Sequence, residues 1–221
     1  MNDAALERLT DKNLLPSPAG AYYCVSSSDN EPARLFLQQL MDGNESLTFD
    51  SDTLADIFKD MSGLQDEVIY HLQKLNFLQQ FEQKQSIKEG TIEDSLPDLL
   101  KQLSSDKKAL LADGQGFYLA SHGFTHEASE ELSAMSGDFV TLYSRHQGII
   151  KGNLNIHSGA FALVDAGGYS QLGFWPIYIG ELVFMLVISG VPRFDQQAFV
   201  DLVWHLHKRY YSYQSPTENN N

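Results

Sequence analysis

The sequence predicts an α+β protein with a small, mainly helical N-terminal part and a larger part built on one antiparallel sheet. Two observations support this class. Segments with apolar residues at every third or fourth position alternate with shorter β-prone runs, which indicates both helices and strands. Gly-containing turns join neighbouring β-prone runs, and such turns favour hairpins. With 221 residues, 43% of them hydrophobic, the chain is long enough for one large or two small domains, and we expect two.

The first thirty residues show little hydrophobic periodicity. Pro16, Pro18 and Gly20 are typical of loops, and a Ser/Asp/Asn cluster at 26–30 marks another loop. Only residues 22–25 are β-prone. We therefore expect residues 1–30 to form a loosely ordered arm.

Residues 31–85 predict three short helices with strand-like runs between and after them. Pro32 marks the start of the first helix, residues 50–52 can cap the second, and Asp66 begins the third. A strand-like run at 77–81 follows. The expected order is helix, short strand, helix, Ser-Gly turn, longer helix and strand. This order resembles a winged helix, so we expect a small winged-helix-like domain here.

The charge of this segment disfavours nucleic acid as its partner. Residues 31–85 contain four basic and ten acidic residues, a net charge of −6, and the whole chain has a net charge of −14. Affinity for nucleic acids and for anionic lipids depends largely on Lys and Arg. We therefore expect no nucleic-acid or membrane partner. The domain then docks a protein or serves only as a helical packing domain.

The rest of the chain predicts the antiparallel sheet. Residues 86–94 are polar and contain Gly90, which is typical of a linker. Residues 95–213 then predict a short helix, a hairpin, a long helix beginning at Thr125, three strands and a terminal helix. The expected strands are residues 108–112, 117–120, 159–165, 172–179 and 182–189. Pairing of each strand with the next along the chain would give a meander with the long helix on one face. We expect residues 214–221 to form a disordered tail.

Three stretches of this part resemble the Roadblock/dynein light chain family. Residues 110–121, LLADGQGFYLAS, have the family's apolar strand, Asp-Gly turn and strand ending in Ala-Ser. Residues 130–136, EELSAMS, resemble its helix rich in small residues, and residues 177–187, IYIGELVFMLV, resemble its fourth and fifth strands around a tight Gly turn. The resemblance covers residues 95–210 and implies a profilin-like five-stranded antiparallel sheet with flanking helices.

The resemblance also implies a dimer in which the central helix and the third strand pair across a two-fold axis. The partner would be a second copy or a paralogous Roadblock-like chain. The interface residues that the resemblance indicates are Leu132, Met135, Phe139, Ala160, Ala162 and Val164. Dimers of the family scaffold or regulate Ras-like GTPases or adapt cargo to motors. We therefore expect a non-enzymatic regulator that binds a small Ras-like GTPase or another signalling protein.

Two alternative functions stay open at this point. One is a winged-helix transcription regulator whose C-terminal domain dimerises. The other is a ligand-sensing domain that uses the sheet as a pocket wall, which predicts a cavity near Phe174, Trp175 and Tyr178.

The sequence contains no motif for catalysis, cofactor binding or metal binding. It lacks a P-loop, and residues 114–116, Gly-Gln-Gly, lack the third glycine of a dinucleotide-binding fingerprint. Cys24 has no His nearby in the sequence to activate it, and a lone cysteine cannot close a disulfide within the chain. Gly123 separates His122 from His126, so a helix does not align them as metal ligands. We expect no enzymatic activity, no cofactor and no metal.

The same sequence predicts a cytoplasmic protein. Its N-terminus lacks the positively charged start and apolar core of a secretory signal. The longest apolar run, residues 177–191, includes Gly180 and Glu181 and is shorter than the roughly 20 residues that a membrane helix needs.

A basic and aromatic cluster lies near the end of the chain. It contains His205, Lys208 and Arg209, followed by Tyr210. These cations can complement the dipole at the C-terminus of the last helix, or they can contact an acidic or phosphorylated partner. We expect His205 and His207, two residues apart, to face solvent.

Overall fold

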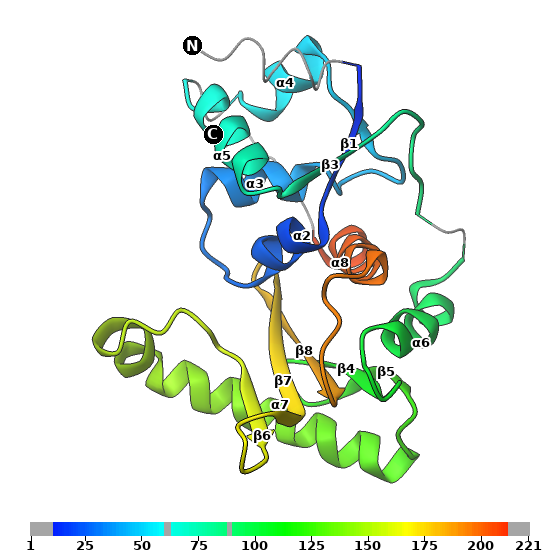
Figure 1. The fold of residues 1–221 in the computed structure, drawn as a ribbon, viewed down its shortest axis with the longest axis vertical. Coiled ribbons are helices and arrows are strands. Elements are labelled where there is room, and N and C mark those ends of the chain that lie inside the picture. Colours follow the sequence, from blue (N-terminus) through cyan, green and yellow to red (C-terminus); the bar gives the residue numbers. More distant parts are fainter. Residues whose placement is uncertain (1–10, 60–62, 88–89, 212–221) are drawn as a thin grey trace, which may run out of the picture.

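The computed structural model describes residues 11–59, 63–87 and 90–211. Figure 1 shows an N-terminal unit of short helices and strands above a larger C-terminal sheet, with the last helix between them. The first ten residues of the expected arm and the expected tail at 214–221 lie outside the described residues.

The C-terminal unit contains the predicted five-stranded antiparallel sheet, which confirms the α+β class. Its strands are β4 (Ala109–Asp113), β5 (Tyr118–His122), β6 (Phe161–Val164), β7 (Ser170–Ile179) and β8 (Leu182–Ser189). The observed order is β5-β4-β8-β7-β6, so the expected meander is wrong. After the β4–β5 hairpin the chain enters helix α7 (His126–Gln147), which carries it across the sheet to β6 at the opposite edge. β8 then pairs with β4 in the centre.

Helices cover both faces of this sheet. Helix α7 packs on the face formed by Leu110, Phe174 and Val187. Helices α6 (Ile92–Gln102) and α8 (Gln197–Tyr210) lie on the other side, where Leu111 and Leu186 point. Because both faces are covered, the apolar runs of β4 and β8 are buried almost continuously and do not alternate between apolar and polar.

The N-terminal unit includes residues that we expected to be loosely ordered. Its elements are β1 (Asn13–Pro16), α2 (Pro18–Val25), α3 (Pro32–Gln39), β2 (Leu47–Thr48), α4 (Ser51–Ile57), α5 (Gln65–Lys74) and β3 (Leu78–Phe81). From α3 to β3 these elements follow the predicted order. However, β2 and β3 are not neighbours, because β1 lies between them and pairs antiparallel with both.

The prediction of a loose arm is therefore wrong for β1 and α2. Leu14 and Leu15 in β1 are fully buried. Pro18 occupies the first turn of α2, where its missing N–H is not needed, and the Ser17 hydroxyl accepts a hydrogen bond from the Gly20 N–H at 3.1 Å. The proline that suggested a loop in the sequence instead starts a helix.

The two units share one hydrophobic core. A single cluster of buried residues extends from Leu14 and Phe36 in the N-terminal unit to Leu202 and Trp204 in α8. The Trp204 indole Nε1 donates a hydrogen bond to the Gly43 carbonyl at 2.9 Å across the junction. The expected linker at 86–94 begins within the N-terminal unit, because Ile87 N–H donates to the Asn44 carbonyl at 3.0 Å. None of the helices in the described parts of the chain is both long and apolar enough to cross a bilayer.

Candidate functional site

Helix α7 is fixed to the sheet by its small and aromatic residues. The Thr125 hydroxyl caps the helix by accepting from the Ala128 N–H at 3.3 Å. Ser129, Ser133 and Ser136 are buried, and the Ser129 and Ser121 hydroxyl oxygens are 2.7 Å apart. The small residues of α7 therefore let the helix approach its own sheet closely. This packing explains the small residues, and no second chain is needed to account for them.

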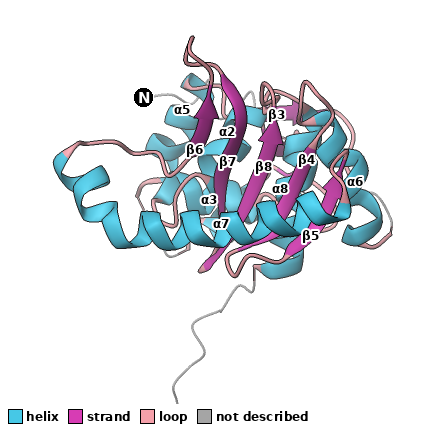
Figure 2. Ribbon diagram, turned by 90° about the horizontal axis from the view of Figure 1, so that it is seen from below, coloured by secondary structure: helices cyan, strands magenta, loops and turns pink. Residues whose placement is uncertain are grey.

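The C-terminal end of α7 extends beyond the sheet that the helix covers. The helix has 22 residues, which corresponds to about 33 Å at 1.5 Å per residue. Five strands spaced by about 4.8 Å span only about 19 Å between the outermost backbones. Figure 2 shows α7 crossing the strands and continuing past the edge strand β6.

A helical turn continues this overhang before the chain returns to β6. It is the π-helix η1 (Gly148–Asn153), and residues 154–160 lead back to the sheet. We define the overhang tip as residues 142–156. Its exposed large apolar side chains are Leu142, Ile149, Leu154 and Ile156. The Lys151 ammonium binds the Asp29 carboxylate at 2.9 Å, which ties the tip to the N-terminal unit.

The edge strand beside the tip also exposes apolar side chains. β6 pairs with β7 on one side, and on its other side no described strand is hydrogen-bonded to it. Leu163 is 55% exposed and Val164 is 57% exposed. Phe161 anchors the strand, because its ring stacks on Phe139 of α7 with centroids 4.9 Å apart. An unpaired edge of this kind can accept another strand.

The structure divides the six predicted interface residues into two groups. Leu132 and Phe139 pack into the core between α7 and the sheet. Met135, Ala162 and Val164 are exposed, and Ala160 is half-buried. Leu142 is exposed as well. Met135, Leu142 and Ile149 recur at seven-residue intervals, so they form one stripe on the outside of the helix.

The exposed residues of the tip were missed in the sequence because of two glycines. Gly148 and Gly152 are typical helix breakers, so the sequence favours a helix end before Ile149. The chain instead makes a wider helical turn there, and the Leu154 N–H donates to the Ile149 carbonyl at 2.9 Å. The signal that could have found the tip is the seven-residue spacing of Met135, Leu142 and Ile149.

The structure divides the predicted basic cluster on α8 into buried histidines and exposed cations. His205 and His207 are both buried, so the expectation that they face solvent is wrong, and His205 cannot contact a partner directly. The His207 ring lies 3.3 Å from the Asp42 carboxylate and stacks on Tyr211 with centroids 4.3 Å apart. Their burial follows from the position of α8 between the two units.

Of the remaining cluster residues, Lys208 and Arg209 are exposed. The Arg209 guanidinium lies 3.6 Å from the Glu93 carboxylate. These two cations lie in the last turn of α8, where they complement the helix dipole.

Within the described parts of the chain, no group of three or more His, Cys, Asp or Glu side chains could hold a metal ion. His126 Nδ1 lies 2.8 Å from the Tyr118 hydroxyl, and its Nε2 lies 3.5 Å from the Glu130 carboxylate. His122 is the last residue of β5. Burial raises the pKa of the Cys24 thiol to about 12, so this thiol stays protonated at neutral pH.

Comparison of the chain with protein-family models, with curated proteins and with solved structures found no match.

Proposed function

We propose that this protein is a non-enzymatic scaffold that forms a two-fold dimer through β6 and α7. The observation that carries the proposal is the overhang, in which a helix covering the sheet is longer than the sheet is wide. A second copy whose β6 pairs with the first would continue the sheet beyond this edge. The overhang tip would then lie over the partner's sheet, and its exposed apolar side chains would be buried.

The charge distribution along α7 supports an antiparallel arrangement of the two helices. The acidic residues Glu127, Glu130, Glu131 and Asp138 all lie in the first thirteen residues of α7. Arg145 and His146 lie in its last turn, and Lys151 follows in η1. In a two-fold dimer the acidic half of one helix faces the basic end of the other, so the long-range electrostatic interaction is attractive.

The outer stripe of α7 supports the same arrangement. Antiparallel helices centred on Leu142 would place Met135 of one copy beside Ile149 of the other, because both lie seven residues from the centre. A heptad spacing of apolar residues is the pattern that lets two helices pack along a shared seam.

The dimerisation proposal is tested by the molar mass of the protein in solution. We expect sedimentation equilibrium at micromolar concentration to give twice the chain mass of 24.8 kDa. Leu142→Glu should shift the protein to monomer, because the new carboxylate would be buried at the centre of the interface. Leu64→Glu is the matched control, since Leu64 and Leu142 are both 41% exposed but Leu64 lies in the N-terminal unit.

Two results would contradict the dimer. A monomeric wild-type chain at tens of micromolar would remove the main support for the scaffold. Equal dissociation of the Leu142→Glu and Leu64→Glu proteins would show that the copies associate through another surface.

The partner that we propose for this dimer is a small Ras-like GTPase or another signalling protein. The support is the resemblance of residues 110–121 and 177–187 to the Roadblock pattern, whose dimers bind such proteins. Any effect on GTP hydrolysis would then arise from the position of the GTPase's own switch loops. Pull-down with Ras-like GTPases in the GDP and GTP states tests this role. If neither state binds, the GTPase proposal is contradicted and only the proposal of a dimeric scaffold remains.

A further inference from the structure

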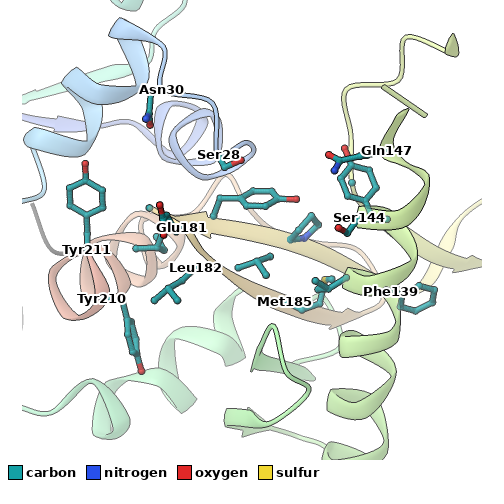
Figure 3. Close-up of a pocket in the computed structure, with 18 residues that line it drawn as sticks. Ser28, Asn30, Phe139, Ser144, Gln147, Glu181, Leu182, Met185, Tyr210 and Tyr211 are labelled. Atoms are coloured by element: carbon teal, nitrogen blue, oxygen red, sulfur yellow. The ribbon is translucent and has the colours of Figure 1, made fainter. Parts of the chain in front are cut away.

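A cleft of about 910 Å³ separates α7 from the hairpin formed by β7 and β8. Figure 3 shows side chains entering it from three parts of the chain: Ser28 from the N-terminal unit, Ser144 and Gln147 from α7, and Glu181 from the turn between β7 and β8. The volume is in the range of small-molecule sites, and sites at the junction of two structural units are common. This cleft is separate from the exposed stripe of α7 and the free edge of β6.

The cleft has a mixed lining, in which aromatic and aliphatic side chains lie beside polar ones such as Ser144 and Gln147. Phe139 and Tyr143 of α7 line it together with Tyr178 of β7 and Met185 of β8. Burial raises the pKa of the Tyr178 hydroxyl, so this ring is neutral at physiological pH. The cleft is therefore lined by a neutral phenol ring at this position. The predicted cavity near Phe174, Trp175 and Tyr178 is present only beside Tyr178, because Phe174 is fully buried and Trp175 packs on Phe194.

The cleft carries one negative charge that no described cation balances. Glu181 is the only charged side chain that lines it, and in the described parts of the chain Glu181 forms no ion pair. The carboxylate is exposed at the rim, next to Leu182.

Two cations, Arg34 and Lys151, line an adjoining cavity of about 310 Å³ and already have partners within the chain. That cavity shares Tyr143 and Tyr178 with the cleft. Its Lys151 binds Asp29. Its Arg34 donates to the Tyr23 and Cys24 carbonyls and lies over the Tyr23 ring, 4.5 Å from the centroid. Both cations are therefore engaged within the chain, and neither of them lines the cleft itself.

We infer that the cleft binds a small organic cation with an apolar body, such as a quaternary ammonium or an alkylated amine. The tyrosine faces attract the cation through their quadrupoles, and the Glu181 carboxylate attracts it at the rim. Methyl or methylene groups around the nitrogen contact the aliphatic wall. The net charge of −14 draws cations towards the protein and repels anions. The lining includes Tyr143, Ser144 and Gln147 of the overhang tip, but none of the outer-stripe residues Met135, Leu142 and Ile149 of the proposed dimer.

The test compares choline with dimethylbutanol, its neutral isostere, in which carbon replaces the quaternary nitrogen. We expect calorimetry or ligand-observed NMR on the full chain to show millimolar or tighter binding of choline. The isostere should bind at least about threefold more weakly, because it lacks the cation–π and carboxylate attraction. Equal binding of the two probes would overturn the cation inference, and absence of choline binding would overturn the site.

Variants then locate the site. Glu181→Gln and Tyr178→Leu should each weaken choline binding at least about threefold. Tyr178→Phe keeps the ring and should bind nearly as well as the wild type. Glu127→Gln, which removes an exposed carboxylate at the other end of α7, should have no effect. Unchanged binding in both Glu181→Gln and Tyr178→Leu would overturn the assignment to this cleft, and each variant's circular dichroism spectrum verifies its fold.

Discussion

At the scale of single residues, Gly20 shows how closely the N-terminal elements pack. It lies within α2, where a glycine ordinarily weakens a helix. A Cβ atom built at this position would overlap the backbone carbonyl of Phe77, just before β3. The absence of a side chain is what lets α2 lie against the turn that leads into β3.

Gly20→Ala should therefore destabilise the protein, although Ala favours helices more than Gly does. We expect a loss of about 1–3 kcal/mol in the free energy of unfolding, because the backbone of Phe77 cannot move away as a flexible side chain would. Urea denaturation followed by circular dichroism measures it. The control is Ala19→Gly at the exposed neighbouring position, which should lose at most about 1 kcal/mol. A Gly20→Ala protein as stable as the wild type would show that α2 is not packed in this way.

The buried histidines of α8 show the limit of prediction from sequence at this scale. His205 and His207 are polar and adjoin Lys208 and Arg209, so the local sequence indicates a solvated helix end. Their burial depends on the N-terminal unit, which contributes Asp42 as a partner for His207. Asp42 is 165 residues away along the chain, and no local pattern connects the two.

At the scale of elements, the side chains that α5 exposes bear on whether the N-terminal unit binds DNA. Val68, Ile69 and Leu72 face the core. The exposed side of the helix presents Lys74, but the acidic Asp66 and Glu67 are also exposed. A recognition helix in the major groove usually offers basic or amide side chains.

We expect no measurable affinity of the full chain for duplex DNA, even at low salt, because α5 and the surrounding acidic surface repel phosphates. Fluorescence anisotropy with a labelled duplex of mixed sequence measures this. Affinity that falls steeply as salt is raised would instead support the transcription-regulator alternative. The Lys74→Glu protein would then have to lose that affinity if α5 is the contact.

Most of the helices and strands could be predicted from the sequence, but the pairing of the strands in the large sheet could not. Periodicity and turn residues indicated all five strands of the large sheet and the helix that begins after Thr125. The pairing of β4 with β8 depends on a contact between residues about 75 positions apart, such as Leu111 with Leu186. Nothing local distinguishes it from a meander. For the candidate site, the residues of β6 could be predicted, whereas the overhang tip was missed, because Gly148 and Gly152 are typical helix breakers and yet both lie within the helical turn η1.

At the scale of the whole molecule, the shared core predicts that the two units unfold together. Trp204 is almost fully buried between them and donates its indole N–H to Gly43. Trp204→Ala would leave a cavity in the common core and an unpaired carbonyl.

We expect Trp204→Ala to lower the free energy of unfolding by about 3–5 kcal/mol. Thermal unfolding should remain a single transition, with coincident curves from circular dichroism and tyrosine fluorescence. Tyr169→Ala, which removes an aromatic ring that is 71% exposed, should change stability by at most about 0.5 kcal/mol. Two separate transitions in the wild type would show that the units are independent domains.

The contact between α2 and α8 has a consequence for synthesis on the ribosome. Helix α2 leaves the ribosomal tunnel early, yet the helix that covers it is made about 170 residues later. Until α8 has been synthesised, the apolar side of α2 that packs on it stays exposed to solvent. Chaperones bind exposed apolar segments of this kind in nascent chains. A messenger truncated before the codons for α8 would therefore yield a product prone to aggregation and rapid proteolysis.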